Sequence, residues 1–311
     1  MKVAFFTEAG LKRGMGHLIR CYTIAQKFKD NFCEVDLFLD SDIDFSYKFN
    51  DLKSFTWDNF QLQKKYDVIF IDSYEATLDI YQEASNNSKV AVFLDDENRL
   101  NYPTGVIINF APDANEEFFQ SKQKENSYLL GLDYIPIRKE FIVSFKEKKE
   151  NIFIILGGTD TEGLSFDIIE LIQDINIPKT IVTNSVKTKE ELEKFENVKV
   201  LYQPKDNELV ESMVTSSLAI STASMTLYEL AYLQIPTITI SVNRNQYNGA
   251  KQSIKYNLAK SNISIEDKNW KNKLHQEVIE SIQIQNTFKV NNQIDGLGTQ
   301  RIFDSISRLI Q

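Results

Sequence analysis

The sequence predicts an α/β protein built from two Rossmann-like domains, each a parallel β-sheet covered by helices. Short runs rich in β-branched and aromatic residues alternate with longer helical patterns along the chain, which is typical of βαβ units. The runs are apolar throughout rather than alternating, as in strands buried on both faces. The length of 311 residues exceeds that at which a single core stops growing, so two domains are expected.

The predicted strands form two successive sets along the chain. The first set comprises Val3–Thr7, Val35–Leu39, Val68–Ile71, Val90–Leu94 and Val106–Ile108. The second set comprises Ile152–Leu156, Thr180–Thr183, Val198–Tyr202, Leu218–Ser221 and Thr237–Ser241. Open α/β sheets bind ligands beyond the carboxyl ends of their strands, so we expect the binding site in the cleft between the two domains.

A charged run without an apolar face separates the two sets of strands. It covers residues 145–151, and the strand pattern restarts directly after it. We therefore expect an N-terminal domain over residues 1–147 and a C-terminal domain over residues 151–297. The tail, residues 298–311, carries Ile302, Ile306 and Leu309 at i, i+4 and i+7, which predicts an amphipathic closing helix.

The composition excludes several classes of function. The net charge of −9 leaves no basic surplus for the phosphates of a nucleic acid, although a nest of backbone N–H groups can still bind one small anion. No apolar run approaches the roughly 18 residues of a membrane-spanning helix, and the charged start is too short for a signal peptide. With only 2 cysteines, we expect a cytoplasmic protein without stable membrane association. The oligomeric state stays open.

The first candidate motif is Gly14-Met-Gly16-His17, which follows a predicted strand and opens a predicted helix. Glycine and histidine are scarce, with 11 and 2 residues in the chain, so their concentration at one place is informative. The glycines allow backbone N–H groups to approach a ligand, and the helix N-terminus favours a neutral imidazole that can accept a proton. Arg20 lies one turn further along the same face. The alternative is a turn that needs small residues, with an incidental histidine.

The second candidate motif ends the first predicted strand of the C-terminal domain. Gly157 and Gly158 are followed there by Thr159 and Asp160. Two glycines make a turn whose N–H groups can line a cleft, and an aspartate can cap the next helix. The alternative is a simple turn with its cap.

The third candidate motif combines small hydroxyl residues with the start of a helix. Ser221 ends a predicted strand, and Ser224, Met225 and Thr226 begin the next helix. Free N–H groups, hydroxyl donors and the helix dipole then converge on one place, which favours an anion. Glu229 lies about one and a half turns into the helix, where its carboxylate could accept hydrogen bonds from ribose hydroxyls. The alternative is a serine-capped helix with a solvated glutamate.

The fourth candidate motif follows the last predicted strand and contains Asn245 and Gln246 after an arginine. Amides and an arginine suit sugar hydroxyls, acetamido groups or phosphate, although by itself the motif is no better than a polar loop. Other polar residues, Asp72-Ser73-Tyr74 and Asp95-Asp96-Glu97, follow strands of the first domain and face the expected cleft.

One acidic segment resembles a metal-binding motif but is interpreted otherwise. Asp40-Ser-Asp42-Ile-Asp44 has the D-x-D spacing of metal-dependent sugar-nucleotide enzymes. Since no other cluster of ligands is suggested by spacing, we interpret it as a solvated acidic turn and expect no metal. The second histidine, His275, lies in a polar helical stretch and is expected at the surface.

Taken together, these motifs resemble one family over nearly the whole chain, the UDP-2,4-diacetamido-2,4,6-trideoxy-β-L-altropyranose hydrolase (PseG) family of pseudaminic acid biosynthesis. That family has a two-domain glycosyltransferase-B (GT-B) fold similar to the MurG-type transferases. The matching segments are G-M-G-H-x-x-R-C at 14–21, I-D-x-Y at 71–74, F-L-D-D-E at 93–97, L-G-G-T-D at 156–160, S-T-A-S-x-T-x-x-E at 221–229 and R-N-Q at 244–246.

The resemblance implies hydrolysis of a UDP-linked diacetamido sugar, with release of UDP and the free sugar. It implies that His17 activates the attacking water, that Tyr74 and Asn245 line the sugar and water site, and that Glu229 belongs to the nucleotide site. It implies neither metal nor cofactor. The chemistry is consistent, because a nucleoside diphosphate is a good leaving group and the reaction needs one base rather than two carboxyls. In-line attack predicts inversion at the anomeric carbon.

The sequence departs from the family at a few positions, and two other functions stay open. Near Phe6 and Glu8 the family commonly has an arginine and an acidic residue, whereas here the arginine is absent and the acid is a glutamate; the family also commonly has histidine where Ser73 stands. The first alternative is a GT-B glycosyltransferase in which His17 activates an acceptor hydroxyl. The second is a catalytically silent protein that binds sugar nucleotides.

Overall fold

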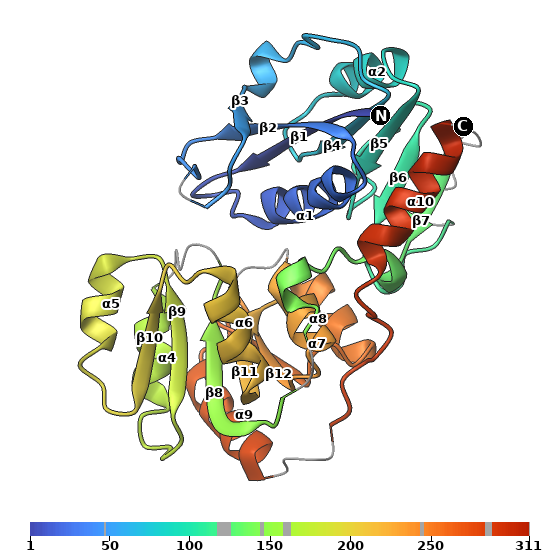
Figure 1. Cartoon of the computed structure of the whole chain (residues 1–311). Helices are drawn as coiled ribbons and strands as arrows, with labels where there is room; N and C mark the ends of the chain where they lie inside the picture. Colours follow the sequence, from blue (N-terminus) through green and yellow to red (C-terminus); the bar gives the residue numbers. More distant parts are fainter. Residues whose placement is uncertain are drawn as a thin grey trace. The chain divides into compact units, whose positions relative to one another are not determined.

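The chain is described by a computed structural model that defines residues 1–46, 48–116, 126–143, 146–157, 163–242, 246–283 and 288–310, with the backbone alone for 246–248. Its contacts divide the chain into two compact units. The first unit comprises Met1–Ile137 together with Asp295–Gln311, and the second comprises Arg138–Ile294 (Figure 1). Each unit holds one parallel sheet flanked by helices, which confirms the predicted fold class.

The first unit contains a seven-stranded sheet of order β3-β2-β1-β4-β5-β6-β7. Its strands are β1 (Lys2–Ala9), β2 (Glu34–Ser41), β3 (Leu52–Ser54), β4 (Val68–Asp72), β5 (Val90–Leu94), β6 (Val106–Asn109) and β7 (Ser127–Leu130). All the described pairs are parallel. Thr7 pairs with Asp72, and Asp72 with Leu94. The segments that follow β1, β4 and β5 therefore start close together, at the carboxyl ends of these strands.

The second unit contains a six-stranded sheet of order β10-β9-β8-β11-β12-β13. Its strands are β8 (Lys149–Ile155), β9 (Lys179–Thr183), β10 (Val198–Tyr202), β11 (Ser216–Thr222), β12 (Thr237–Ser241) and β13 (Ser261–Ser264). The described pairs are again parallel. The chain order reverses beside β8, which pairs with β9 on one side and β11 on the other. This is the switch point beyond which doubly wound sheets bind ligands.

Helices connect the successive strands of the second unit, and in the first unit one α-helix connects β1 to β2 and another connects β4 to β5. The first unit has α1 (Gly16–Asp30), α2 (Leu78–Asn86) and α10 (Gly298–Ile310), with the short 3₁₀ turns η1 (Trp57–Asn59) and η2 (Leu132–Tyr134). Figure 1 shows α1 and α2 on opposite faces of the sheet. The second unit has η3 (Lys139–Phe141), α4 (Leu164–Leu171), α5 (Val186–Leu192), α6 (Asp206–Val214), α7 (Met225–Tyr232), α8 (Gln246–Lys255) and α9 (Trp270–Gln283). None of the described helices is both long and apolar enough to cross a bilayer.

The predicted strands coincide with ten of the observed strands, to within three residues at either end. Three edge strands, β3, β7 and β13, were not predicted. They have only three or four residues and are not apolar throughout, whereas β10, the fourth edge strand, has five residues and was predicted. The pattern of β13 is polar, and only Ile263 among its residues is buried.

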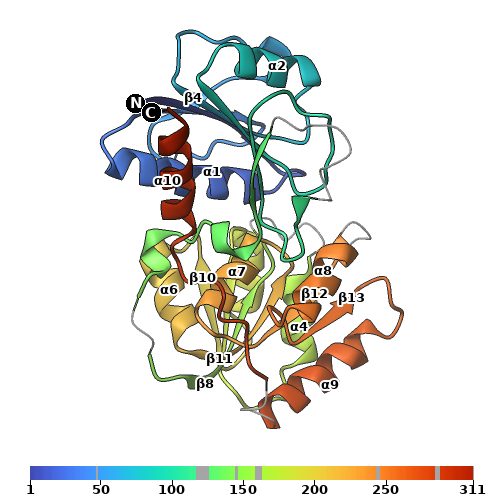
Figure 2. The ribbon, with the colours of Figure 1, turned by 90° about the vertical axis from the view of Figure 1, so that its right-hand side faces the viewer.

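The division of the chain differs from the predicted boundaries. The units meet between Ile137 and Arg138, whereas the charged run 145–151, expected as the linker, already contains the first residues of β8. The chain re-enters the first unit at Asp295. Residues 295–297, which were predicted to belong to the C-terminal domain, therefore belong to the first unit. The closing helix α10 belongs to the first unit, where it packs on α1 (Figure 2), and Phe303 meets Phe28 with ring centroids 5.1 Å apart.

The start of α10 requires a glycine for a different reason than a turn. Gly298 is the first residue of the helix, and a Cβ built on it would lie 2.0 Å from the carbonyl oxygen of Ile135. Only a residue without a side chain allows this close approach between two backbones. Gly296, two residues earlier, has φ +78°, a backbone conformation that favours glycine for its own reason.

Candidate functional site

The loop between β1 and α1 is a tight, bridged turn. Gly10 and Gly14 exchange two backbone hydrogen bonds, with N···O distances of 3.0 and 2.8 Å, and Gly14 adopts φ +70°, which favours glycine. Cβ atoms built on Gly14 and Gly16 would meet nothing within 4 Å. The helix α1 starts at Gly16 without a side-chain cap. The loop therefore presents uncovered backbone at a helix N-terminus, where N–H groups lack intrahelical acceptors.

His17, the second residue of α1, is held by a buried carboxylate. Its Nδ1 lies 2.6 Å from Oδ1 of Asp72, the last residue of β4, and both side chains are buried. Nδ1 also lies 3.1 Å from Nη2 of Arg20. Because the ionised Asp72 is the nearer partner and can only accept, we infer that Nδ1 carries the hydrogen and that Nε2 is left as the nitrogen that can accept a proton. The position of His17 in the first turn of the helix predicted that the helix dipole sets the state of the ring. The structure adds Asp72 as the group that orients it.

Arg20 completes this cluster from one turn further along α1. Its Nε and Nη2 each lie 2.6 Å from an oxygen of Asp72, and Nη1 lies 2.6 Å from Oδ2 of Asp96. Burial alone would raise the pKa of Asp72, but Arg20 and His17 hold it well below its usual range. With a neutral imidazole the Arg20, Asp72 and Asp96 charges sum to −1. A proton accepted by His17 would therefore be balanced locally.

Tyr74 flanks the imidazole from the segment after β4. Its ring meets that of His17 edge-to-face, with centroids 4.6 Å apart and an interplanar angle of 88°. The Tyr74 side chain is 48% exposed, so this side of the cluster is open. Two positions that depart from the family, Glu8 and Ser73, touch each other directly beneath it, because the Ser73 hydroxyl donates to Glu8 Oε2.

The acidic segment 40–44 begins within β2 and has a structural role, and Asp40 is paired rather than solvated. Oδ1 of Asp40 accepts hydrogen bonds from both terminal nitrogens of Arg13 at 3.1 Å. Oδ1 of Asp42 accepts the N–H of Leu11 at 3.1 Å. In the part of the chain that the structure describes, no group of three or more His, Cys, Asp or Glu side chains could hold a metal. Asp40 and Asp42 thus tie the β1–α1 loop to the end of β2.

In the second unit, the junction of β11 and α7 carries part of the third motif. Ser221 is fully buried, and its hydroxyl donates to the carbonyl of Thr222 at 3.3 Å, so it is unavailable to a ligand in this conformation. Ser224 is the N-cap residue of α7 but makes no side-chain capping bond, which rules out the simple serine cap. Met225 and Thr226 open the helix with N–H groups that have no intrahelical acceptor.

Glu229 is neither solvated nor isolated. It is buried, and its two oxygens accept hydrogen bonds from Nε and Nη2 of Arg138 at 2.7 and 2.9 Å. Nη1 of Arg138 reaches Oδ1 of Asp206 at 2.7 Å, and its guanidinium lies over the ring of Phe141. Although burial alone would lower the pKa of Arg138, Glu229 and Asp206 raise it above its usual value. The alternative of a solvated glutamate is therefore wrong.

Sequence reasoning missed Arg138 entirely. It stands directly after the apolar segment 135–137, and its partners lie 68 and 91 residues away. A charged residue that continues an apolar run is a weak sign of burial. Without the partners, nothing local distinguishes it from a surface arginine.

Several predicted site residues fall outside what the structure describes. These are Gly158, Thr159, Asn245 and the side chain of Gln246, whose backbone begins α8. Gly157 is described, with φ +91°, and a Cβ on it would lie 3.9 Å from Oγ1 of Thr222. It therefore lies beside the end of β11 and the start of the α7 motif. Among the described candidates, the structure gathers His17, Arg20 and Tyr74 in the first unit and the α7 residues in the second.

The fold defines the class of protein. A Staphylococcus aureus MnaA structure with UDP matches with a TM-score of 0.70 at 12% identity, covering 99% of this chain and 96% of that one. The MurG of Acinetobacter baumannii matches with a TM-score of 0.66 at 12% identity, covering 99% and 100%. These similarities show the GT-B fold. No protein-family model matches the sequence.

Relatives found by sequence similarity indicate a smaller group of proteins within the GT-B fold. An uncharacterized protein of Methanocaldococcus jannaschii is 28% identical over 79% of this chain and 57% of its own length. A Helicobacter pylori protein named pseudaminic acid cytidylyltransferase and UDP-2,4-diacetamido-2,4,6-trideoxy-β-L-altropyranose hydrolase is 26% identical, over 81% of this chain and 46% of its own. The Campylobacter jejuni protein named for the hydrolase alone is 24% identical over 63% and 74%. The chain thus spans about half the length of the first two relatives. Relatives and fold together support a PseG-like GT-B family.

Proposed function

We propose that this chain is an inverting hydrolase that cleaves a UDP-linked diacetamido-trideoxy sugar and releases UDP and the free sugar. The observation that carries the proposal is the pair formed by His17 and Asp72, with Nδ1 hydrogen-bonded to a buried carboxylate at 2.6 Å. This pair leaves Nε2 as a proton acceptor beside the exposed ring of Tyr74. The names of the Helicobacter and Campylobacter relatives supply the substrate class. The setting would be nonulosonic acid biosynthesis of the pseudaminic type.

In this mechanism His17 takes a proton from water as the oxygen attacks the anomeric carbon. Asp72, which Arg20 holds in place, keeps the imidazole in the required tautomer, and the net −1 charge of Arg20, Asp72 and Asp96 balances the imidazolium that forms. Tyr74 and Asn245 line the sugar and water site. The departing diphosphate needs no proton, only donors for its negative charge.

The remaining proposed ligands serve the nucleotide and the sugar. The start of α7, with Ser224, Met225 and Thr226, would supply N–H groups to the phosphates. Glu229 would accept hydrogen bonds from the ribose hydroxyls. The other proposed binding residues are Gly14, Gly16, Gly157, Gly158, Thr159, Ser221 and Gln246; a role for the Ser221 side chain would need its hydroxyl to turn from the carbonyl that it now bonds.

A GT-B glycosyltransferase is the second candidate, favoured by the fold shared with MurG. The same base would then deprotonate an acceptor hydroxyl rather than water. Incubation with candidate UDP-sugars in ¹⁸O-water without an acceptor separates the two functions. Label in the free sugar with the inverted anomer, observed by NMR, supports the hydrolase. Label in UDP contradicts the proposed attack at carbon, and the absence of UDP release favours the transferase.

Substitution of the base tests the assignment of His17. We expect His17→Ala to lower turnover by about 10²-fold or more, the usual scale for a general base, while UDP binding stays near the wild-type level. His275→Ala is the matched control, because the other histidine of the chain pairs with Asp174 on the second unit. Near wild-type turnover in His17→Ala would refute the role of this residue.

A further inference from the structure

The ring of Tyr74 is positioned through its backbone. The side chain is 48% exposed and its described ring contact is with His17. The N–H of Tyr74 donates to Oε1 of Glu8 at 2.9 Å. Glu8 lies on β1 and is 1% exposed, so a buried strand residue holds the loop that carries the exposed ring.

The carboxylate of Glu8 joins three separate segments of the first unit. Besides Tyr74 N–H, it accepts the Ser73 hydroxyl and, at 2.8 Å, the indole Nε1–H of Trp57 on η1. The oxygen of Ser73 in turn accepts two backbone N–H groups of the same turn, each at 2.8 Å. Since a buried carboxylate is costly without donors, loss of one donor is expected to disturb the whole arrangement.

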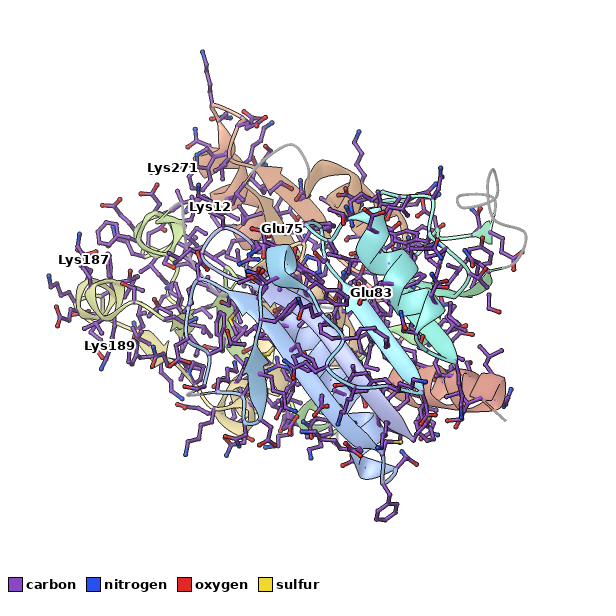
Figure 3. The ribbon with its side chains drawn as sticks, turned by 90° about the horizontal axis from the view of Figure 1, so that it is seen from above. Lys12, Glu75, Glu83, Lys187, Lys189 and Lys271 are labelled. Atoms are coloured by element: carbon purple, nitrogen blue, oxygen red, sulfur yellow. The ribbon has the colours of Figure 1, made fainter. Side chains whose placement is uncertain are left out.

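Trp57 is itself tied back to the loop that precedes His17. Its backbone N–H donates to Oδ2 of Asp40 at 2.9 Å, and Oδ1 of Asp40 accepts Arg13. Arg13 also reaches Glu75, the neighbour of Tyr74, at 3.2 Å. In Figure 3, Lys12 marks the first loop and Glu75 marks the second, side by side. These contacts form a closed chain that starts at the Tyr74 loop and returns to it.

We propose that Glu8 and Trp57 are positioning residues that fix the Tyr74 ring against His17. This inference rests on the proposed function for its catalytic consequence, but its geometric part stands on the contacts alone. Neither residue need touch the substrate: Glu8 is buried beneath the loop, and the Trp57 side chain is buried. Displacement of a catalytic group by about 1 Å can cost roughly 10²-fold in rate, so the positioning is expected to appear in kcat.

Two substitutions test the contact from its two ends. Trp57→Phe removes the indole N–H and keeps an aromatic ring, and Glu8→Gln keeps the shape while replacing an acceptor oxygen by a donor. We expect each to lower kcat roughly 10- to 100-fold with little change in the Kd for UDP. Trp270→Phe is the matched control, because the other tryptophan packs on the core of the second unit. Circular dichroism at the assay temperature confirms that each variant is folded.

A double-mutant cycle separates positioning from general support of the fold. If Glu8 acts through the ring of Tyr74, Glu8→Gln should add less than about twofold to the loss in kcat that Tyr74→Ala already causes. Losses that multiply in the double variant would overturn the proposal. So would a folded Trp57→Phe variant with wild-type kcat.

An NMR measurement decides the geometry independently of activity. With 2 histidines in the chain, His17→Ala assigns the imidazole C–H signals, and Tyr74→Ala gives their position without the ring current of the phenol. Trp57→Phe and Glu8→Gln should move the His17 signals towards the Tyr74→Ala values. Unchanged signals would refute the positioning. A wild-type protein that releases no UDP from any UDP-sugar would instead refute the proposed function and leave this test intact.

Discussion

The two units each contain a buried arginine that binds carboxylates in the same way. Arg20 in the first unit and Arg138 in the second each place Nε and Nη2 on one carboxylate and Nη1 on an aspartate. Both guanidiniums face an aromatic ring, that of Phe110 or Phe141. Bidentate arginine bonds fix the plane of a carboxylate as well as its charge.

The difference between the clusters is what lies beyond the carboxylate. Asp72 is hydrogen-bonded to Nδ1 of His17 and so fixes the orientation of the ring, which leaves Nε2 able to accept a proton. Glu229 has no histidine partner among the described residues, so what it can offer is acceptor oxygens. The comparison teaches that the same bidentate arrangement can hold a carboxylate that orients a histidine in the first unit and a buried carboxylate without such a partner in the second.

The largest expected effect comes from Asp72→Asn. An amide offers one acceptor oxygen in place of two, so it cannot keep the bond from Nε of Arg20 to Oδ2 together with the bonds from Nη2 of Arg20 and Nδ1 of His17 to Oδ1. If its NH₂ group turns to His17, it favours the tautomer with hydrogen on Nε2. We expect turnover to fall by about 10²–10⁴-fold, and stability to fall by about 3–5 kcal/mol because Arg20 loses its buried partner. Turnover of the folded fraction, measured beside UDP binding, checks this.

Asp96→Asn is the matched control, because Asp96 contacts only Nη1 of Arg20 in this cluster and is partly exposed. Its effect on turnover should be below about 10-fold. Turnover of Asp72→Asn within threefold of the wild type would contradict the role of Asp72.

The second unit should respond in binding rather than in chemistry. Arg138→Lys keeps the charge but loses the bidentate bond to Glu229, and we expect it to weaken UDP binding about 10-fold with a smaller effect on kcat. Arg138→Leu leaves Glu229 and Asp206 without their partner and should cost about 3–5 kcal/mol of stability. Isothermal titration with UDP measures the first effect. Arg308→Lys, at an exposed position of α10, is the control. Wild-type affinity in Arg138→Lys would break the comparison.

A pair of helical glycines, one in each unit, tests packing alone. Gly298→Ala forces a Cβ to 2.0 Å from the carbonyl oxygen of Ile135, so we expect a loss of about 1–3 kcal/mol. Gly249→Ala, inside α8 with nothing within 4 Å of its Cβ, should gain up to about 1 kcal/mol from helix propensity. Denaturant unfolding of both variants checks the opposite signs. Equal stability of Gly298→Ala and wild type would refute the close approach.

The smallest expected effect is a pH dependence in the first unit. Burial alone would raise the pKa of Asp36, but hydrogen bonds from Lys53, Lys64 and Tyr66 lower it to about 2. Because the folded-state pKa lies below the unfolded value of about 3.9, the stabilisation is present above that value and is lost as the pH falls towards 2. Asp36→Asn should lower stability at neutral pH by about 1 kcal/mol and flatten the decline between pH 4 and 2. An unchanged acid profile would contradict this assignment.

Much of the fold could be predicted because buried parallel strands leave a continuous apolar signal. The central strands carry that signal, whereas the edge strands β3, β7 and β13 do not. Segments that follow parallel strands gather beyond the carboxyl ends of those strands. This predicted that the segments with His17 and Tyr74 lie close together, and the two rings are in contact. The domain boundary was misplaced, because the charged residues at Lys149–Asn151 belong to a strand and the segment at Ile137 is apolar.

The sequence by itself determined the fold class, the position of the glycine loops and the choice of His17 as the candidate base. These depend on local periodicity and on rare residues at the ends of strands. Only the tertiary structure decided which carboxylate orients His17, that Arg138 covers Glu229, and that Glu8 joins Trp57 to the Tyr74 loop. The reason is physical: the pairing of buried charges is set by which strands become neighbours. Partners 49 to 91 residues apart leave no local trace in the chain.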